Sequence, residues 1–133
     1  MQNYHKHTDY SNVLVADCAA TYSDYVKRAK ELGHKVISSV EHGFQSNYYI
    51  PYELVVQNNE GAKKKLDSGE ITRSEYEKEL LKFVFGAEAY WVKDRHEKDR
   101  SNCHIVLLAK NEEGRQDINE ALSDANIDGY YGQ

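Results

Sequence analysis

The sequence predicts an α/β fold, in which helices pack against a sheet and candidate functional residues gather at one edge of that sheet. Short runs of β-branched and aromatic residues alternate with stretches of helical periodicity. Residue types that bind metal ions stand at or near the ends of the predicted strands. The 133 residues, of which 40% are hydrophobic, are enough for one domain with a core.

The first predicted strand ends at a pair of histidines, His5 and His7. Residues i and i+2 of a strand face the same side, roughly 7 Å apart along the backbone, so both imidazoles can reach one divalent ion. A His-x-His pair also arises by chance in a chain with six histidines, so the pair alone is a weak signal.

The next segments read as a helix and a strand. Thr21 and Asp24 predict a capping box at the start of the helix, and Gly33 predicts its end. The apolar residues of this helix recur at helical spacing: Tyr25, Val26, Ala29 and Leu32. The β-branched run 35–40 then predicts a strand, which delivers Glu41-His42-Gly43 at its carboxyl end.

A second helix is predicted from Pro51 toward Asn58, followed by a helical insertion around 59–81. The turn of the insertion falls at Asp67-Ser-Gly69, and Thr72 opens its second helix with a capping box. Its basic and acidic residues cancel, which favours a solvated face over a binding arm.

Two further strands and a helix complete the prediction. Residues 82–92 are strand-like, and Gly86 within them predicts either a bulge or a close approach of another segment. Residues 102–109 form the second run and carry Cys103-His104 near its start. Asn111 predicts the cap of the last helix, whose inner face is Ile118, Ala121, Leu122 and Ala125.

Composition narrows the possible environments and partners. A formal net charge of −5 argues against a surface that holds nucleic acid by charge alone, although bound divalent ions could turn an acidic pocket into a phosphate site. Cys18 and Cys103 follow no CxxC pattern, and no leader or membrane-length apolar run is evident. We therefore expect a cytoplasmic protein without membrane contact. Two histidines, His34 and His96, are interpreted as surface residues.

Several of these motifs occur together in one known family. The relevant residues are His5-Lys-His7-Thr with Tyr10-Ser11, Glu41-His42-Gly43, Gly86-x-Glu88-x-Tyr90, and Asn102-Cys-His104 before a run that ends at Asn111. In this order they resemble the amino-terminal part of a PHP (polymerase and histidinol phosphatase) domain. The form most similar is the one that opens bacterial and phage DNA polymerase III alpha subunits.

The resemblance implies a fold and a ligand set. The expected fold for residues 1–133 is the first half of a distorted (β/α)7 barrel, about four strands, with the second half absent. Two or three ions of zinc, manganese or iron are expected. The family's metal ligands fall on six positions of this sequence: His5, His7, Asp17, His42, Glu88 and His104. Glu41 replaces a commoner aspartate and is expected to orient a ligand instead of binding metal.

The implied activity is metal-dependent phosphoester hydrolysis, and the polymerase setting implies a 3′–5′ exonuclease that removes misincorporated nucleotides, impaired if the barrel is incomplete. Two alternatives stay open: a non-catalytic, metal-stabilised part of a polymerase, and a small-molecule phosphatase of the histidinol-phosphatase type. Four strands cannot close such a barrel, so an open sheet edge is expected. The expected partners are therefore DNA or another phosphoester, and either the remainder of a larger protein or a second copy of this chain.

Overall fold

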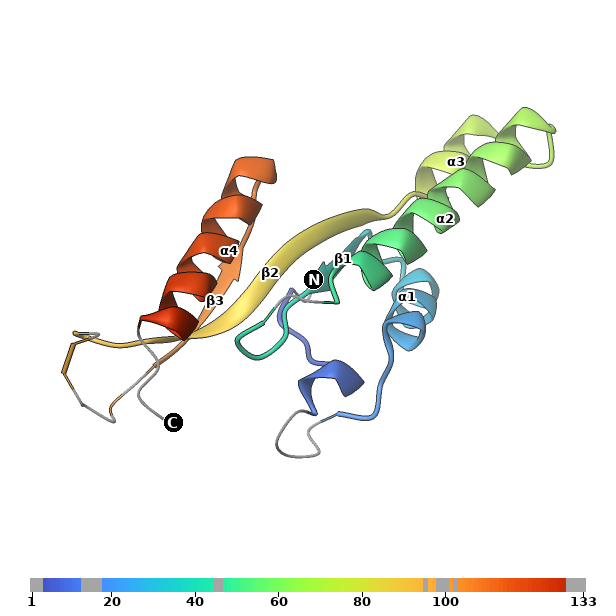
Figure 1. The fold of residues 1–133 in the computed structure, drawn as a ribbon. Coiled ribbons are helices and arrows are strands. Elements are labelled where there is room, and N and C mark those ends of the chain that lie inside the picture. The colour runs from blue at the N-terminus through green and yellow to red at the C-terminus, as the bar shows by residue number, and fades with distance from the viewer. Residues whose placement is uncertain are drawn as a thin grey trace.

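The structure of this chain, a computed structural model, describes residues 4–12, 18–44, 47–94, 96–97, 101 and 103–128. Helices and strands are interspersed along the sequence, as Figure 1 shows. In chain order the elements are the 3-10 turn η1 (Asp9–Ser11), α1 (Tyr22–Glu31), β1 (Val36–Ser39), α2 (Tyr49–Asp67), α3 (Arg73–Glu79), β2 (Lys82–Trp91), β3 (Cys103–Leu108) and α4 (Glu112–Ile127). The predicted α/β class is confirmed.

The sheet has the order β1-β2-β3, and β2 is its long central strand (Figure 1). β1 runs parallel to the first half of β2, with Val36 opposite Lys82. β3 runs antiparallel to the second half of β2, with Gly86 opposite Leu108. The described residues thus form three strands, where about four were expected, and the incomplete barrel stays a prediction.

The predicted strand at His5 and His7 is wrong for residues 4–8, which belong to no strand of the described chain. The Ser38 side chain explains how this segment is fixed beside β1 instead. Its hydroxyl donates a hydrogen bond to the Tyr4 carbonyl (2.7 Å) and accepts one from Lys6 Nζ (2.8 Å). A side chain of β1 therefore supplies contacts that a backbone ladder would otherwise provide.

α1 begins where its capping box was predicted. The Thr21 hydroxyl accepts from the Asp24 N–H, and the Asp24 side chain accepts from the Thr21 N–H. The predicted apolar face is only partly correct, because Leu32 is 52% exposed whereas Tyr22 in the first turn is 2% exposed. Tyr22 is buried because its hydroxyl reaches a polar network under the helix, which helical periodicity alone could not indicate.

α2 is one continuous helix to Asp67, so the predicted break near Asn58 is wrong. Asn58 and Asn59 do not end the helix because their side chains face the chain that returns from α3. Asn58 Nδ2 donates to the Glu79 carbonyl at 2.9 Å, and the Asn59 amide both donates to and accepts from the Leu81 backbone at 2.9 Å. The α2–α3 hairpin that projects at one end of Figure 1 is thereby fastened at its base.

The turn of this hairpin follows the prediction. Gly69 adopts a φ of 75°, a left-handed conformation that glycine tolerates without strain. Thr72 and Glu75 then form the predicted capping box at the start of α3.

Apolar packing places the helices on the sheet in two clusters. One joins α1, β1 and α2 through Ala29, Ile37 and Val55. The other joins β2 to α4 through Phe85, Ala87 and Ile118. The rest of the predicted inner face of α4 is less buried than Ile118. Among the described residues, none of the helices has both the length and the hydrophobicity of a membrane-spanning segment.

Gly86 marks a close approach between strands. A Cβ atom at this position would lie 2.6 Å from the Leu107 carbonyl oxygen and 2.8 Å from Leu108 Cδ2. Its φ is not among the positive glycine values of the described chain. Of the two predicted alternatives, close approach and not a bulge is the one observed.

Candidate metal centre

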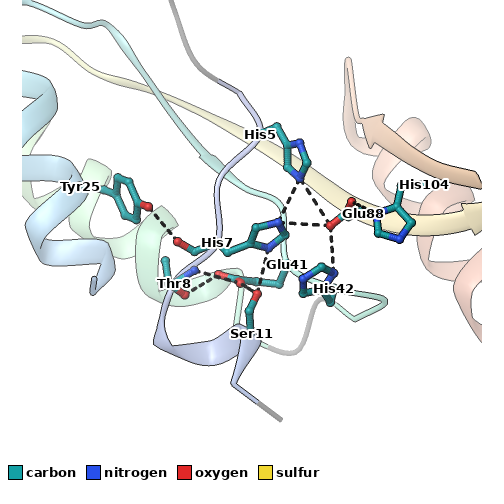
Figure 2. A network of polar contacts seen from close by, with 9 residues as sticks. All are labelled: His5, His7, Thr8, Ser11, Tyr25, Glu41, His42, Glu88 and His104. Atoms are coloured by element: carbon teal, nitrogen blue, oxygen red, sulfur yellow. Dashed lines mark hydrogen bonds and ion pairs between the residues drawn. The ribbon is translucent and has the colours of Figure 1, made fainter. Parts of the chain in front are cut away.

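Glu88 lies at the centre of a cluster of imidazoles, and its side chain is almost completely buried (Figure 2). One carboxylate oxygen, Oε1, lies 2.8 Å from His104 Nδ1. The other oxygen, Oε2, faces three rings at once: it lies 2.9 Å from His42 Nδ1, 3.2 Å from His7 Nε2 and 3.5 Å from His5 Nε2. Both oxygens of a single carboxylate thus face imidazole nitrogens.

The sheet and its loops bring these side chains together. His42 follows β1 and forms an isolated parallel bridge with Glu88, flanked by backbone bonds from Glu88 N to the Glu41 carbonyl (3.0 Å) and from Gly43 N to the Glu88 carbonyl (2.7 Å). His104 lies on β3 opposite Tyr90, two residues along β2 from Glu88. These backbone contacts fix the two histidines relative to the carboxylate.

His5 and His7 approach from the N-terminal segment. Their Nε2 atoms are 3.1 Å apart, and the His7 ring stacks on His42 with centroids at 4.1 Å. The alternation expected of an extended segment is kept, because Lys6 between them points to Ser38. Tyr25 of α1 helps to fix the segment by donating a hydrogen bond to the His7 carbonyl at 2.9 Å.

Glu41, immediately before His42, is a second buried carboxylate with a different role. It accepts hydrogen bonds from Thr8 N (3.2 Å), Thr8 Oγ1 (2.5 Å), Tyr22 Oη (2.6 Å) and Ser11 Oγ. Its oxygens are therefore occupied by donors that clamp the N-terminal segment onto the end of β1. The expectation that Glu41 orients the site agrees with this geometry.

Burial changes the acid–base properties of two groups near Glu41. Desolvation, together with the hydrogen bond to Glu41, raises the pKa of Tyr22 well above its usual range. Desolvation lowers the pKa of Lys6 to about 8, against the attraction of Glu41, which raises it. Tyr22 is thus held as a neutral donor, whereas a charged Lys6 is disfavoured by its surroundings.

The donor set fits a divalent metal ion. Ligand atoms of His5, His7 and Glu88 all lie within 4.8 Å of one another. Glu88 Oε2 is buried, and none of the described residues donates a hydrogen bond of suitable geometry to it. Its lone pairs therefore face the imidazole cluster and are available to a cation. Imidazole and carboxylate together suit zinc, manganese or iron better than calcium.

The structure brings five of the six predicted ligands together: His5, His7, His42, Glu88 and His104. The sixth, Asp17, lies outside the described residues. His96 is exposed, and His34 is partly exposed just beyond α1. Metal binding by the five remains a prediction, but their convergence is a property of the fold.

Sequence reasoning assigned no role to Thr8, Ser11 or Tyr22, which surround Glu41. The one local signal was the hydroxyl-bearing residues close to His7 in sequence. Tyr22 gave no such signal, because its contact with Glu41 depends on how α1 packs beside β1.

Comparison with known proteins gives a consistent result. The family model described as "PHP domain" matches residues 3–133. The DNA polymerase III subunit alpha of Helicobacter pylori (strain ATCC 700392 / 26695) is 31% identical over 130 residues, which cover 96% of this chain and 9% of that protein. The same subunit of Aquifex aeolicus is 26% identical over 138 residues, and that of Borreliella burgdorferi 29% over 133 residues; each match covers 96% of this chain and 10% of the relative. The chain spans about a tenth of the length of these relatives.

Proposed function

This chain belongs to the PHP domain family, and from that premise we propose that it is a metal-dependent phosphoester hydrolase module of a DNA polymerase III alpha-like protein. One observation carries the proposal: the buried Glu88 carboxylate has imidazoles against both of its oxygens. A packed core rarely holds ionisable groups in this density without a ligand to neutralise them.

Each side chain has a defined role in the proposal. His5, His7 and Glu88 would hold a divalent ion, and His104, beside the other oxygen of the same carboxylate, would contribute to holding a second. His42 adds a nitrogen on the Oε2 side, and Asp17 completes the proposed ligand set. When bound, zinc, manganese or iron supplies positive charge for the phosphoryl oxygens and acidity for water.

The remaining residues prepare this site for substrate. Glu41 and its donors fix the N-terminal segment, so the orientation of His7 does not have to be acquired on binding. The side chains of His5 and His104 are 46% and 54% exposed, which leaves the cluster open to a phosphoester from solvent. The relationship to polymerase subunits favours single-stranded DNA, cleaved from its 3′ end, as the substrate.

A second candidate is a metal-stabilised module that hydrolyses nothing. The observation that favours it is the connectivity of the cluster, which joins the N-terminal segment, the end of β1, β2 and β3. An ion held there would fasten these segments whether or not a substrate reached it. The partner in both cases would be the remainder of a polymerase-like protein or a second copy of this chain.

The two candidates separate in a hydrolysis assay. The chain would be incubated with Mn²⁺ and either 5′-labelled single-stranded DNA or p-nitrophenyl phosphate, next to a Glu88→Gln variant purified identically. Shortening of the DNA from its 3′ end by the wild type alone supports the exonuclease, and release of p-nitrophenol alone supports a small-molecule phosphatase. Absence of both activities, or equal activity in the variant, would contradict the hydrolase proposal.

A further inference from the structure

We propose that Ser11 is a positioning residue that fixes the tautomer of His7, placing the ring proton on Nδ1 and the lone pair on Nε2. The inference deepens the proposed metal site and rests on it. Nothing in the ligand set itself dictates this tautomer, because either ring nitrogen of a neutral histidine can carry the proton.

The Ser11 hydroxyl lies between the His7 ring and the Glu41 carboxylate. Ser11 belongs to η1 and is 6% exposed. Its Oγ lies 3.0 Å from His7 Nδ1 and also bonds to Glu41 Oε2 (Figure 2). Ser11 thus links the buried carboxylate beneath the site to the histidine at its centre.

The available protons determine which atom donates in the hydrogen bonds that Ser11 makes with Glu41 and His7. An ionised carboxylate only accepts hydrogen bonds, and Glu41 faces four donors. The single proton of Ser11 therefore points to Glu41. The hydroxyl can then only accept from His7 Nδ1, which must carry a proton.

This assignment has a consequence at the other end of the ring. His7 Nε2 presents a lone pair at 3.2 Å from Glu88 Oε2 and 3.1 Å from His5 Nε2. A lone pair and a carboxylate oxygen at that distance repel each other unless a cation lies between them. Ser11 thereby prepares the acceptor-rich geometry that a metal ion needs, before any ion arrives.

Thr8 provides a matched control. Its hydroxyl also donates to Glu41, at 2.5 Å, but no contact between that hydroxyl and an imidazole is found among the described residues. Thr8→Val removes one donor from Glu41, as Ser11→Ala does, together with the acceptor for Tyr10 N at the start of η1, but it keeps the Ser11 hydroxyl as the acceptor for His7. A difference between the two variants isolates the bond to the ring.

The first readout is the tautomer itself. The whole 133-residue chain, labelled with ¹⁵N-histidine and freed of metal, would be measured by long-range ¹H–¹⁵N correlation at about pH 8, above the usual pKa of histidine. We expect a protonated Nδ1 and an unprotonated Nε2 for His7. A proton on Nε2, in the other tautomer or in an imidazolium, would overturn the proposal even if no variant folds.

The second readout compares the variants. Ser11→Ala should shift His7 toward the Nε2–H tautomer and weaken Zn²⁺ binding by roughly tenfold to a hundredfold, measured by competition with a fluorescent chelator. Thr8→Val should keep the tautomer of the wild type. A Ser11→Ala protein that keeps the Nδ1–H tautomer contradicts the inference, whatever its affinity. None of these measurements needs hydrolysis, so they hold or fail independently of the proposed activity.

Discussion

The environment of Glu88 determines what this residue can do. Burial of a carboxylate destabilises the folded state unless hydrogen bonds or opposite charges compensate it. Glu88 is only 3% exposed and therefore needs such partners. Glu41, equally buried, is compensated by four donors from the protein. Among the described residues, the side-chain partners of the Glu88 carboxylate are imidazoles, which compensate it as cations or by sharing a metal ion with it. The two carboxylates thus differ in their surroundings: protein donors hold Glu41 in place, whereas Glu88 is the one proposed to bind a metal ion.

Removing one imidazole tests the ligand set. His7→Ala should lower zinc affinity by at least about tenfold, because His7 Nε2 is central among the proposed donors. His34→Ala is the control, since His34 lies just beyond α1 and is not in the cluster. Titration calorimetry would give the affinities. Equal affinity in the two variants would count against the assignment.

Lys6 should make stability depend on pH in a predictable direction. The pKa of Lys6 in the folded chain, about 8, lies below the ordinary lysine value of 10.5, so between these values the unfolded chain binds more protons and stability rises with pH. Below about pH 8 the full penalty of a buried charge is present. Lys6→Met should therefore stabilise the metal-free protein at pH 7 by roughly 1 to 3 kcal/mol.

Urea unfolding at several pH values measures this effect. The advantage of Lys6→Met should shrink as the pH rises from about 8 to above 10.5, where the wild-type lysine is neutral in both the folded and the unfolded chain. If the free energies of unfolding of the two proteins changed with pH in parallel, desolvation of Lys6 would not be the cause of the pH dependence.

At the scale of elements, contact between β2 and β3 depends on the absence of a side chain at Gly86. Gly86→Ala should destabilise the protein by about 1 to 3 kcal/mol, because its Cβ would meet the Leu107 carbonyl at 2.6 Å. It should also weaken metal binding, since β3 carries His104. Chemical unfolding and zinc titration would measure the two effects.

Gly61→Ala is the matched control for this prediction. Gly61 lies inside α2, and no atom approaches within 4 Å of a Cβ built there. Alanine at that position should stabilise the helix by roughly 0.5 to 1 kcal/mol. If both substitutions changed the free energy of unfolding in the same direction, steric contact at Gly86 would not be the cause of its effect.

Local signals explain which elements the sequence could predict. The capping boxes at Thr21 and Thr72 lie within four residues of sequence, and both helices begin there. The length of α2 could not be predicted, because Asn58 and Asn59 look like helix-ending residues until the returning backbone at Leu81 is seen. The segment at His5 failed as a strand for the same reason: its partner is a side chain, Ser38, and not a backbone ladder.

The sequence indicated which described side chains gather at the candidate site more readily than it indicated the elements around them. The five proposed ligands that converge could be named from the sequence because each lies in a motif that the resemblance to a known family supplied. The hydroxyls that orient them were not assigned, since threonine, serine and tyrosine are common in loops and caps. Only the arrangement of α1 over the end of β1 shows that Tyr22 reaches Glu41.

At the scale of the whole molecule, the cluster joins segments that are far apart in sequence. An ion bound only to the folded state should therefore raise stability, by about 2.7 kcal/mol at a concentration a hundredfold above its dissociation constant. Thermal unfolding with Zn²⁺ and with EDTA would show a higher midpoint for the metal-loaded protein. His7→Ala should lose most of this difference, and an unchanged wild-type midpoint would contradict metal binding at the cluster.

The alternation along β2 ties the site to the core. Phe85 and Ala87 pack with α4, and Glu88, next in sequence, points to the opposite side. Slippage of this strand by one position would turn the carboxylate toward the aromatic side chains and expose the apolar ones. A chain mispaired in this way would lose its hydrophobic contacts and its imidazole partners together. A register error that removes the candidate metal centre would therefore also expose apolar surface.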